Sequence, residues 1–170
     1  MRKNIGSTLI TLSILLLFLI YYPFISLYLF PPSISLQPKS GSYILIPKIN
    51  ALAPIIENVD PWSEKEYKEA LKKGVAKAKG TNFYFAHSSL PPWEMTRINT
   101  AFLRLGELKN GDQIKIIKDG QELNYMVSGK KEVWPNEVTY LTTSQSELVL
   151  QTCTPLGTAF KRLLVFAEPI

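Results

Sequence analysis

The chain has 170 residues, of which 46% are hydrophobic, and a formal net charge of +5. This length fits one domain of ordinary size with an appendage, and the mild charge, without a concentrated basic patch, argues against nucleic-acid binding. One cysteine and one histidine exclude an internal disulfide and a zinc site built from several Cys and His ligands.

The amino-terminal segment, residues 1–30, is expected to anchor the chain in a membrane. No charged residue lies between Asn4 and Pro38, and Ile5–Tyr22 is an unbroken run of apolar and small uncharged residues. At about 1.5 Å per residue this run nearly spans a hydrocarbon core of about 30 Å. The run is longer than the core of a cleaved signal peptide, roughly 7–15 residues, which is the alternative. We therefore expect one retained span over about residues 5–30.

The charges beside this span set the expected orientation. Arg2 and Lys3 precede it and should stay in the cytoplasm, so that the rest of the chain lies outside. Residues 31–42 contain several prolines and serines and form the expected linker. We therefore expect a single-pass protein of the cell membrane with an extracytoplasmic domain over residues 43–170.

Short apolar runs separated by turn signals predict that this domain is mostly β. Asp119-Gly120 supports a type I′ hairpin turn between two of the runs. Many short strands with one or two helices suggest a small β-barrel. The expected strands are Tyr43–Ile46, Leu52–Ile56, Asn82–Ala86, Gln113–Lys118, Glu122–Ser128, Val133–Tyr140 (strand or edge, interrupted by Pro135), Glu147–Thr152 and Arg162–Ala167.

Two segments are expected to be helical. Ser63 and Glu66 fit a capping box at the start of a helix over Glu64–Lys73, which Gly74 ends. Thr100–Leu108 is the second expected helix. The tripeptide Asp60-Pro61-Trp62 before the first helix is interpreted as a turn.

Three residues could carry chemistry, although each signal is weak when taken alone. Cys153 follows a strand pattern, where a thiol is held rigidly, but it also fits a small buried hydrophobic residue. His87 also follows a strand and is the only imidazole that could lower the thiol pKa and protonate a leaving amine. Arg162 could lie beside Cys153 if their two strands run antiparallel, or it could be a surface cation next to Lys161.

The combination of these residues, in this order, resembles the sortase family of cysteine transpeptidases. Leu148–Pro155 is similar to the sortase motif TLxTC followed by proline, with Val149 in place of threonine. Arg162-Leu163-Leu164-Val165 is similar to the strand that follows it. Phe85–Ser88 resembles the histidine motif, with Ala86 in place of the usual glycine. Asp60-Pro61-Trp62 resembles the lid tripeptide of pilin-polymerising sortases, but it follows the first strand instead of preceding it.

The resemblance implies an eight-stranded β-barrel and a thioester mechanism. Cys153 would attack the threonine carbonyl of an LPxTG-like sorting signal, His87 would transfer protons, and Arg162 would hold the substrate or the oxyanion. Thr152 and Ser88 are further candidates for supporting the substrate or oxyanion. No metal and no cofactor are required. The implied partners are surface proteins bearing a sorting signal, and an amine from a cell-wall precursor or a pilin lysine.

Two other functions remain open at this point. One is a non-catalytic, membrane-tethered β-barrel that binds a partner, in which Cys153 would be inert. The other is a different cysteine peptidase or transpeptidase of the cell envelope. Papain-like chains place the cysteine before the histidine, whereas His87 precedes Cys153, and the Ser-His-Gly-Cys type motif of L,D-transpeptidases is absent.

Overall fold

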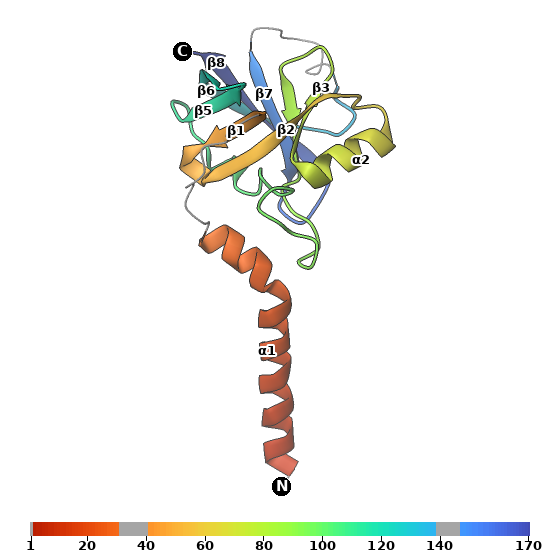
Figure 1. Cartoon of the computed structure of the whole chain (residues 1–170). Coiled ribbons are helices and arrows are strands. Elements are labelled where there is room, and N and C mark those ends of the chain that lie inside the picture. Colours follow the sequence, from red (N-terminus) through yellow and green to blue (C-terminus); the bar gives the residue numbers. More distant parts are fainter. Residues whose placement is uncertain (1, 31–40, 139–146) are drawn as a thin grey trace.

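The computed structural model describes residues 2–30, 41–138 and 147–170. A long amino-terminal helix leads into one β-domain that carries a single further α-helix (Figure 1). The helices are α1 (Arg2–Leu29) and α2 (Glu64–Lys73), and the short 3-10 turns are Pro47–Ile49 and Leu105–Glu107. The strands are β1 (Ser42–Ile46), β2 (Ala51–Val59), β3 (Val75–Ala78), β4 (Phe83–Phe85), β5 (Gln113–Lys118), β6 (Gln121–Val133), β7 (Leu148–Thr154) and β8 (Lys161–Pro169).

The strands close into an eight-stranded barrel in the order β1-β2-β3-β4-β7-β8-β6-β5, with β5 returning to β1. Most neighbours are antiparallel, but β2 pairs with β3 and β4 pairs with β7 in parallel. The mostly β, eight-stranded barrel expected from the family resemblance is thereby confirmed. The parallel pair β4–β7 matters most for function because the two strands end side by side.

The barrel interior is filled by alternate side chains of the strands, as a closed sheet requires. Buried and partly exposed positions alternate along β2 and β5. The fully buried side chains include Ile44, Ile114, Leu148, Leu150 and Val165. These residues are branched and apolar, which suits a packed barrel core and leaves the ends of the strands to carry polar groups.

Helix α2 has the predicted bounds, but the predicted capping box is wrong. Ser63 makes no side-chain cap hydrogen bond. Glu66 Oε1 instead accepts a bond from the backbone N–H of Asp60, at 3.1 Å. Gly74 ends the helix, and a Cβ there would lie 2.2 Å from the carbonyl oxygen of Pro54, so only glycine fits this close approach to β2.

The segment 100–108 is not the predicted α-helix: it consists of turns and the 3-10 turn Leu105–Glu107. Asn99 Oδ1 accepts a bond from the Thr96 N–H, and Thr96 Oγ1 accepts one from the Asn99 N–H. Such side-chain bonds compete with the helical backbone pattern. Several apolar residues of the segment are buried together, which a helix with one apolar face would not achieve: Ala101, Phe102, Leu103, Leu105 and Leu108.

Two further strand predictions need correction. The predicted strand Val133–Tyr140 does not form over its described part beyond Val133, because β6 ends there and a turn follows at Pro135 and Asn136. Thr139 and Tyr140 lie outside the described residues. Strand β3 was not predicted, since Val75-Ala76-Lys77-Ala78 is short and rich in alanine. The Asp-Gly hairpin turn is confirmed, with φ of 49° at Asp119 and 82° at Gly120.

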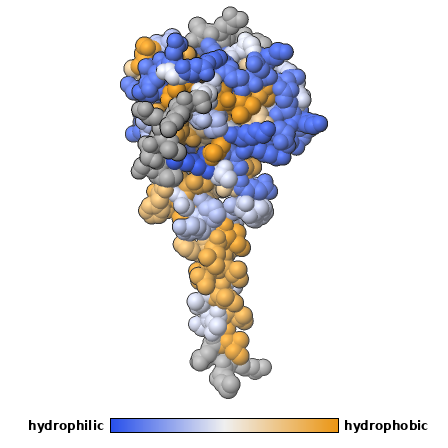
Figure 2. Space-filling model, in the orientation of Figure 1, coloured by the Kyte–Doolittle hydropathy of each residue, from blue (hydrophilic) through white to orange (hydrophobic). Residues whose placement is uncertain are grey.

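Helix α1 is long and apolar enough over Ile5–Leu29 to cross a membrane. Figure 2 shows it as an apolar column below a largely hydrophilic domain. Its residues 5–22 are exposed, whereas Pro23–Tyr28 are half-buried. Pro23 lies inside the helix, and α1 bends in its upper part so that its last turns lie under the domain (Figure 1). Most of the expected linker, residues 31–40, lies outside the described residues.

Candidate active site

The register between β4 and β7 brings His87 and Cys153 to the same level of the sheet. These strands run parallel, with Phe85 paired to Gln151. The backbone N–H of Ala86 donates to the Gln151 carbonyl at 3.2 Å, which extends the pairing beyond β4. Two residues further along each strand stand His87 and Cys153. His87 follows the end of β4, and Cys153 lies in the last part of β7, so both lie toward the same end of these neighbouring strands.

Strand β8 brings Arg162 to the other side of Cys153. The antiparallel ladder between β7 and β8 pairs Cys153 directly with Arg162. Directly opposed residues in a ladder point to the same face of the sheet. Histidine, cysteine and arginine therefore form one row across β4, β7 and β8, which we call the reactive row: His87, Cys153 and Arg162. Adjacent strands lie about 4.8 Å apart, so neighbouring members are within reach of one another.

All three residues line one cavity of about 290 Å³, which we call the strand-side cavity. Its walls come from β4, β7, the start of α2 and the segment after β6, and most of them are apolar. The remaining lining residues are Pro61, Trp62, Tyr67, Leu71, Phe83, Phe85, Ala86, Pro135, Val138, Gln151 and Thr152. A largely apolar cleft with a few convergent polar groups is the usual form of a substrate site.

Burial lowers the pKa of His87 from its ordinary value, because desolvation disfavours the charged imidazolium. At neutral pH the free protein therefore holds His87 mainly as neutral imidazole. The imidazolium form of His87 is then a minor form of the free protein at neutral pH.

The guanidinium of Arg162 is held by backbone carbonyls. Its Nη1 donates to the carbonyl of Ala159 at 3.0 Å and to that of Lys161 at 3.3 Å. Among residues 2–30, 41–138 and 147–170, no carboxylate forms an ion pair with it, whereas the neighbouring Lys161 pairs with Glu132 at 3.4 Å. Arg162 thus keeps an uncompensated positive charge at the cavity and is oriented by its own loop.

The two supporting candidates, Thr152 and Ser88, lie in different surroundings. Thr152 is 4% exposed, and its hydroxyl donates to the Ala86 carbonyl at 2.9 Å. Its one proton is engaged there, so the hydroxyl ties β7 to the segment that carries His87. Ser88 is 2% exposed and does not line the strand-side cavity. It lines a second cavity, described below, that also reaches Cys153.

Sequence reasoning missed several wall residues of the strand-side cavity. Trp62 is 71% exposed and lines it together with Pro61, so the tripeptide Asp60-Pro61-Trp62 is the predicted turn and also borders the site. The backbone N–H of Trp62 donates to the Asp60 carboxylate at 2.9 Å, which stabilises the turn. The signal that could have identified Trp62 as a wall residue was a large aromatic side chain in a predicted turn, where it is expected to be exposed. In the described part of the chain, no group of three His, Cys, Asp or Glu side chains could hold a metal ion.

An eight-stranded barrel with a cysteine, a histidine and an arginine lining one cavity is an arrangement that suits the cysteine acyl-transfer class of enzymes. A family model described as a sortase domain matches residues 44–170. Sortase D of Bacillus subtilis (strain 168) is 32% identical over 144 residues, which cover 80% of this chain and 68% of that protein. The chain belongs to the sortase family, and it is a sortase-type transpeptidase in that general sense.

Solved sortase structures share the fold. Sortase C1 of GBS Pilus Island 1 is 27% identical with a TM-score of 0.64, and the match covers 79% of this chain and 66% of that chain. Sortase C-1 from Actinomyces oris is 29% identical with a TM-score of 0.63, over 76% of this chain and 71% of that chain. The chain therefore spans about two thirds of the length of these relatives.

Proposed function

We propose that this protein cleaves an LPxTG-like carboxy-terminal sorting signal through a thioester on Cys153 and transfers the acyl group to an amine at the cell surface. The observation that carries the proposal is the reactive row, in which the chain's only thiol lies between its only imidazole and the Arg162 guanidinium, and all three residues line one cavity. Family membership supports the transpeptidase class, and the chemistry of this row supports the residue roles.

In the first half-reaction the Cys153 thiolate attacks the threonine carbonyl carbon. The bond from that carbon to the glycine nitrogen breaks, and His87 as imidazolium gives its proton to the leaving amine. In the second half-reaction an incoming amine attacks the thioester, His87 takes its proton, and the carbon–sulfur bond breaks to regenerate the thiolate. Arg162 stabilises the negative charge that develops on the carbonyl oxygen in both steps.

The strand-side cavity suits the acyl portion of such a substrate. Phe83 and Phe85 of β4 and Trp62 of the turn supply apolar walls, and Cys153 and Arg162 line the same cavity. A peptide whose short apolar side chains fill this cavity would present its carbonyl to the thiol. The proposed partners are therefore surface proteins that carry a sorting signal, together with an amine from a cell-wall precursor or a pilin lysine.

We propose in the same way that the catalytic domain is extracytoplasmic. Arg2 and Lys3 precede the apolar helix α1, and the domain follows it. A sorting signal and its acceptor amine would meet the enzyme on that side of the cell membrane.

The deciding experiment is trapping of the acyl-enzyme. The full chain in detergent micelles is incubated with a panel of sorting peptides, and the intact mass is measured by mass spectrometry. Because Cys153 is the only cysteine, a mass increase equal to the cleaved peptide acyl group assigns the thioester. Hydroxylamine should then release a peptide hydroxamate from the wild type. Cys153→Ala should release none, and His87→Ala should release it only at a very low rate. Hydroxamate release by Cys153→Ala would refute the proposal.

A further inference from the structure

A second cavity, of about 180 Å³, reaches Cys153 and is partly built by the membrane anchor. Thr152 and Cys153 line both this cavity and the strand-side cavity. The remaining lining residues are Tyr28, Ser88, Phe102, Leu103, Arg104, Gly106, Glu107, Thr154, Leu156 and Leu163. We call it the anchor-side cavity, because Tyr28 belongs to α1. Cys153 thus borders two cavities, one of which is also lined by a residue near the end of α1.

Contacts with the domain fix Tyr28 in place. The Arg104 guanidinium lies 5.8 Å from the centre of the Tyr28 ring. Arg104 also makes two hydrogen bonds to Glu107, of 2.9 and 2.7 Å. Ring, guanidinium and carboxylate therefore form one connected wall of the anchor-side cavity.

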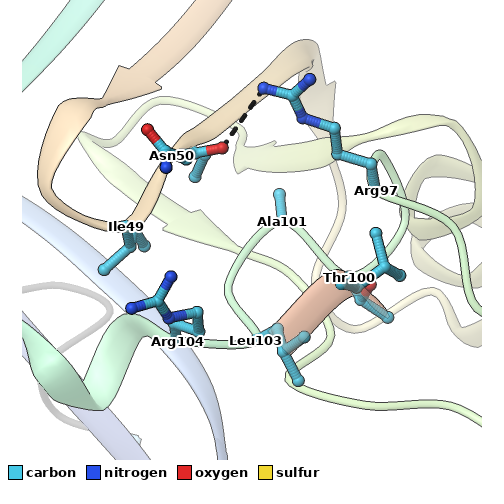
Figure 3. Close-up of a pocket in the computed structure, with 9 residues that line it drawn as sticks. Ile49, Asn50, Arg97, Thr100, Ala101, Leu103 and Arg104 are labelled. Carbon is cyan, nitrogen blue, oxygen red and sulfur yellow. Dashed lines mark hydrogen bonds between the residues drawn. The ribbon is translucent and has the colours of Figure 1, made fainter. Parts of the chain in front are cut away.

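The adjacent residue Leu27 packs beside this wall. It lines a small hollow with Ile49, Arg97 and Arg104. Figure 3 shows Arg97 reaching toward Asn50 while Arg104 extends under Ile49, and the Arg97 bond to the Asn50 carbonyl measures 3.3 Å. The last turns of α1 thus pack along the segment 97–107, which agrees with the half-burial of Pro23–Tyr28.

The position of the cavity relative to the membrane follows from the helix. The exposed part of α1, residues 5–22, rises about 27 Å at 1.5 Å per residue, which is close to the thickness of a hydrocarbon core. The bend at Pro23 therefore falls near the membrane surface, and Tyr28 lies within roughly 10 Å of it along the helix. A ligand attached to the membrane can reach this cavity without leaving the surface.

The lining of the cavity suits an uncharged amine. Phe102, Leu103 and Leu163 are apolar, and the charges of Arg104 and Glu107 offset one another. Desolvation in such surroundings disfavours an ammonium ion relative to the free amine. Only the free amine has the lone pair that attacks a thioester.

We propose that the anchor-side cavity admits the second substrate, the primary amine of a membrane-attached acceptor, and that Tyr28 of the anchor completes this site. This inference rests on the proposed function and adds the route of the acceptor. The acyl group lies in the strand-side cavity, and the amine approaches the thioester carbon from the opposite side of Cys153. The membrane helix is then part of the acceptor site as well as a tether.

The first test fills the cavity. A Cβ on Gly106 would lie 3.7 Å from the Leu163 side chain, in ordinary contact, whereas a Cβ on Gly129 would meet nothing within 4 Å. Gly106→Leu therefore adds bulk on the cavity side, and Gly129→Leu is the matched control. The full chain is reconstituted in lipid nanodiscs that contain a phospholipid carrying diglycine on its headgroup. For each variant the rate of transfer to this lipid is divided by the rate of hydroxamate formation with hydroxylamine, which is too small to need the cavity.

Gly106→Leu should lower this ratio about tenfold, and Gly129→Leu should leave it within twofold. Tyr28→Ala should lower it at least threefold, Tyr28→Phe should retain most of it because the ring remains, and Tyr22→Ala in the exposed part of the helix should not change it. Equal ratios in Gly106→Leu and Gly129→Leu would overturn the acceptor cavity, as would a uniform loss of both rates. A wild type that forms no acyl-enzyme would instead refute the proposed function, and this inference with it.

Discussion

The hydroxyl of Thr152 should be needed to hold His87 beside Cys153, and Thr152→Val tests this directly. Valine keeps the size of the side chain but cannot donate the 2.9 Å bond to the Ala86 carbonyl. Ala86 is 6% exposed, so its carbonyl would be left without that donor in a largely buried place. Leaving a buried acceptor unsatisfied costs about 1–3 kcal/mol. For a chain of this size that loss lowers the melting temperature by roughly 3–9 °C.

The effect on catalysis should exceed the effect on folding. Ala86 directly precedes His87, so releasing its carbonyl loosens the imidazole relative to the thiol. Misplacing a catalytic group by about 1 Å can cost on the order of 10²-fold in rate. We therefore expect the rate of thioester formation in Thr152→Val to fall by about 10-fold to 10²-fold.

Thr100→Val provides the matched control. Thr100 is 3% exposed, and its hydroxyl donates to the Thr96 carbonyl at 2.6 Å, so the same chemistry is removed away from the reactive row. Calorimetry and single-turnover acylation are measured on both variants. Thr100→Val should lose stability but keep its acylation rate. If the two variants lose acylation equally, or neither does, the positioning argument is wrong.

Three further outcomes follow from the site and the anchor. Arg162→Ala should lower turnover by on the order of 10²–10³, and Arg162→Lys should remain impaired because it lacks the planar fork; near-normal steady-state rates would make Arg162 a surface cation. Since the folded state lowers the His87 pKa, the unfolded state binds more protons, and the free energy of unfolding should fall as the pH drops through about 6.5. Denaturant titrations at several pH values should show a weaker dependence of this free energy on pH in His87→Gln. Protease added to intact protoplasts should remove the domain beyond Lys39, and its protection would contradict the external orientation.

The strands with strong local patterns were predictable from the sequence. Gln113–Lys118 and the hairpin that follows it carry alternating apolar residues and an Asp-Gly turn, and both appear as expected. The segment 100–108 misled because its apolar residues fit helical spacing, whereas side-chain bonds between Thr96 and Asn99 and burial on several sides favour turns. Local propensity does not register such tertiary preferences.

The sequence predicted that Cys153, His87 and Arg162 could lie together, and the structure brings them to one cavity, but the surroundings of these residues were not predictable. Cys153, His87 and Arg162 each follow or open a strand pattern, and a family motif joins them. The second cavity could not be foreseen, because Tyr28, Ser88 and Glu107 come from segments that only the folded chain brings together. A sequence read in order offers no signal for a contact between an anchor helix and a loop 75 residues or more away.

The pairing of residues in the reactive row limits where residues can be inserted into or deleted from this chain. Since side chains alternate along a strand, one residue inserted into β7 before Cys153 would turn the thiol to the opposite face and break its pairing with Arg162. The same insertion in the hairpin turn at Asp119-Gly120 would leave the three strands in register. Insertions and deletions among relatives of this chain should therefore gather in the connections, while the spacing from Leu148 to Cys153 stays constant.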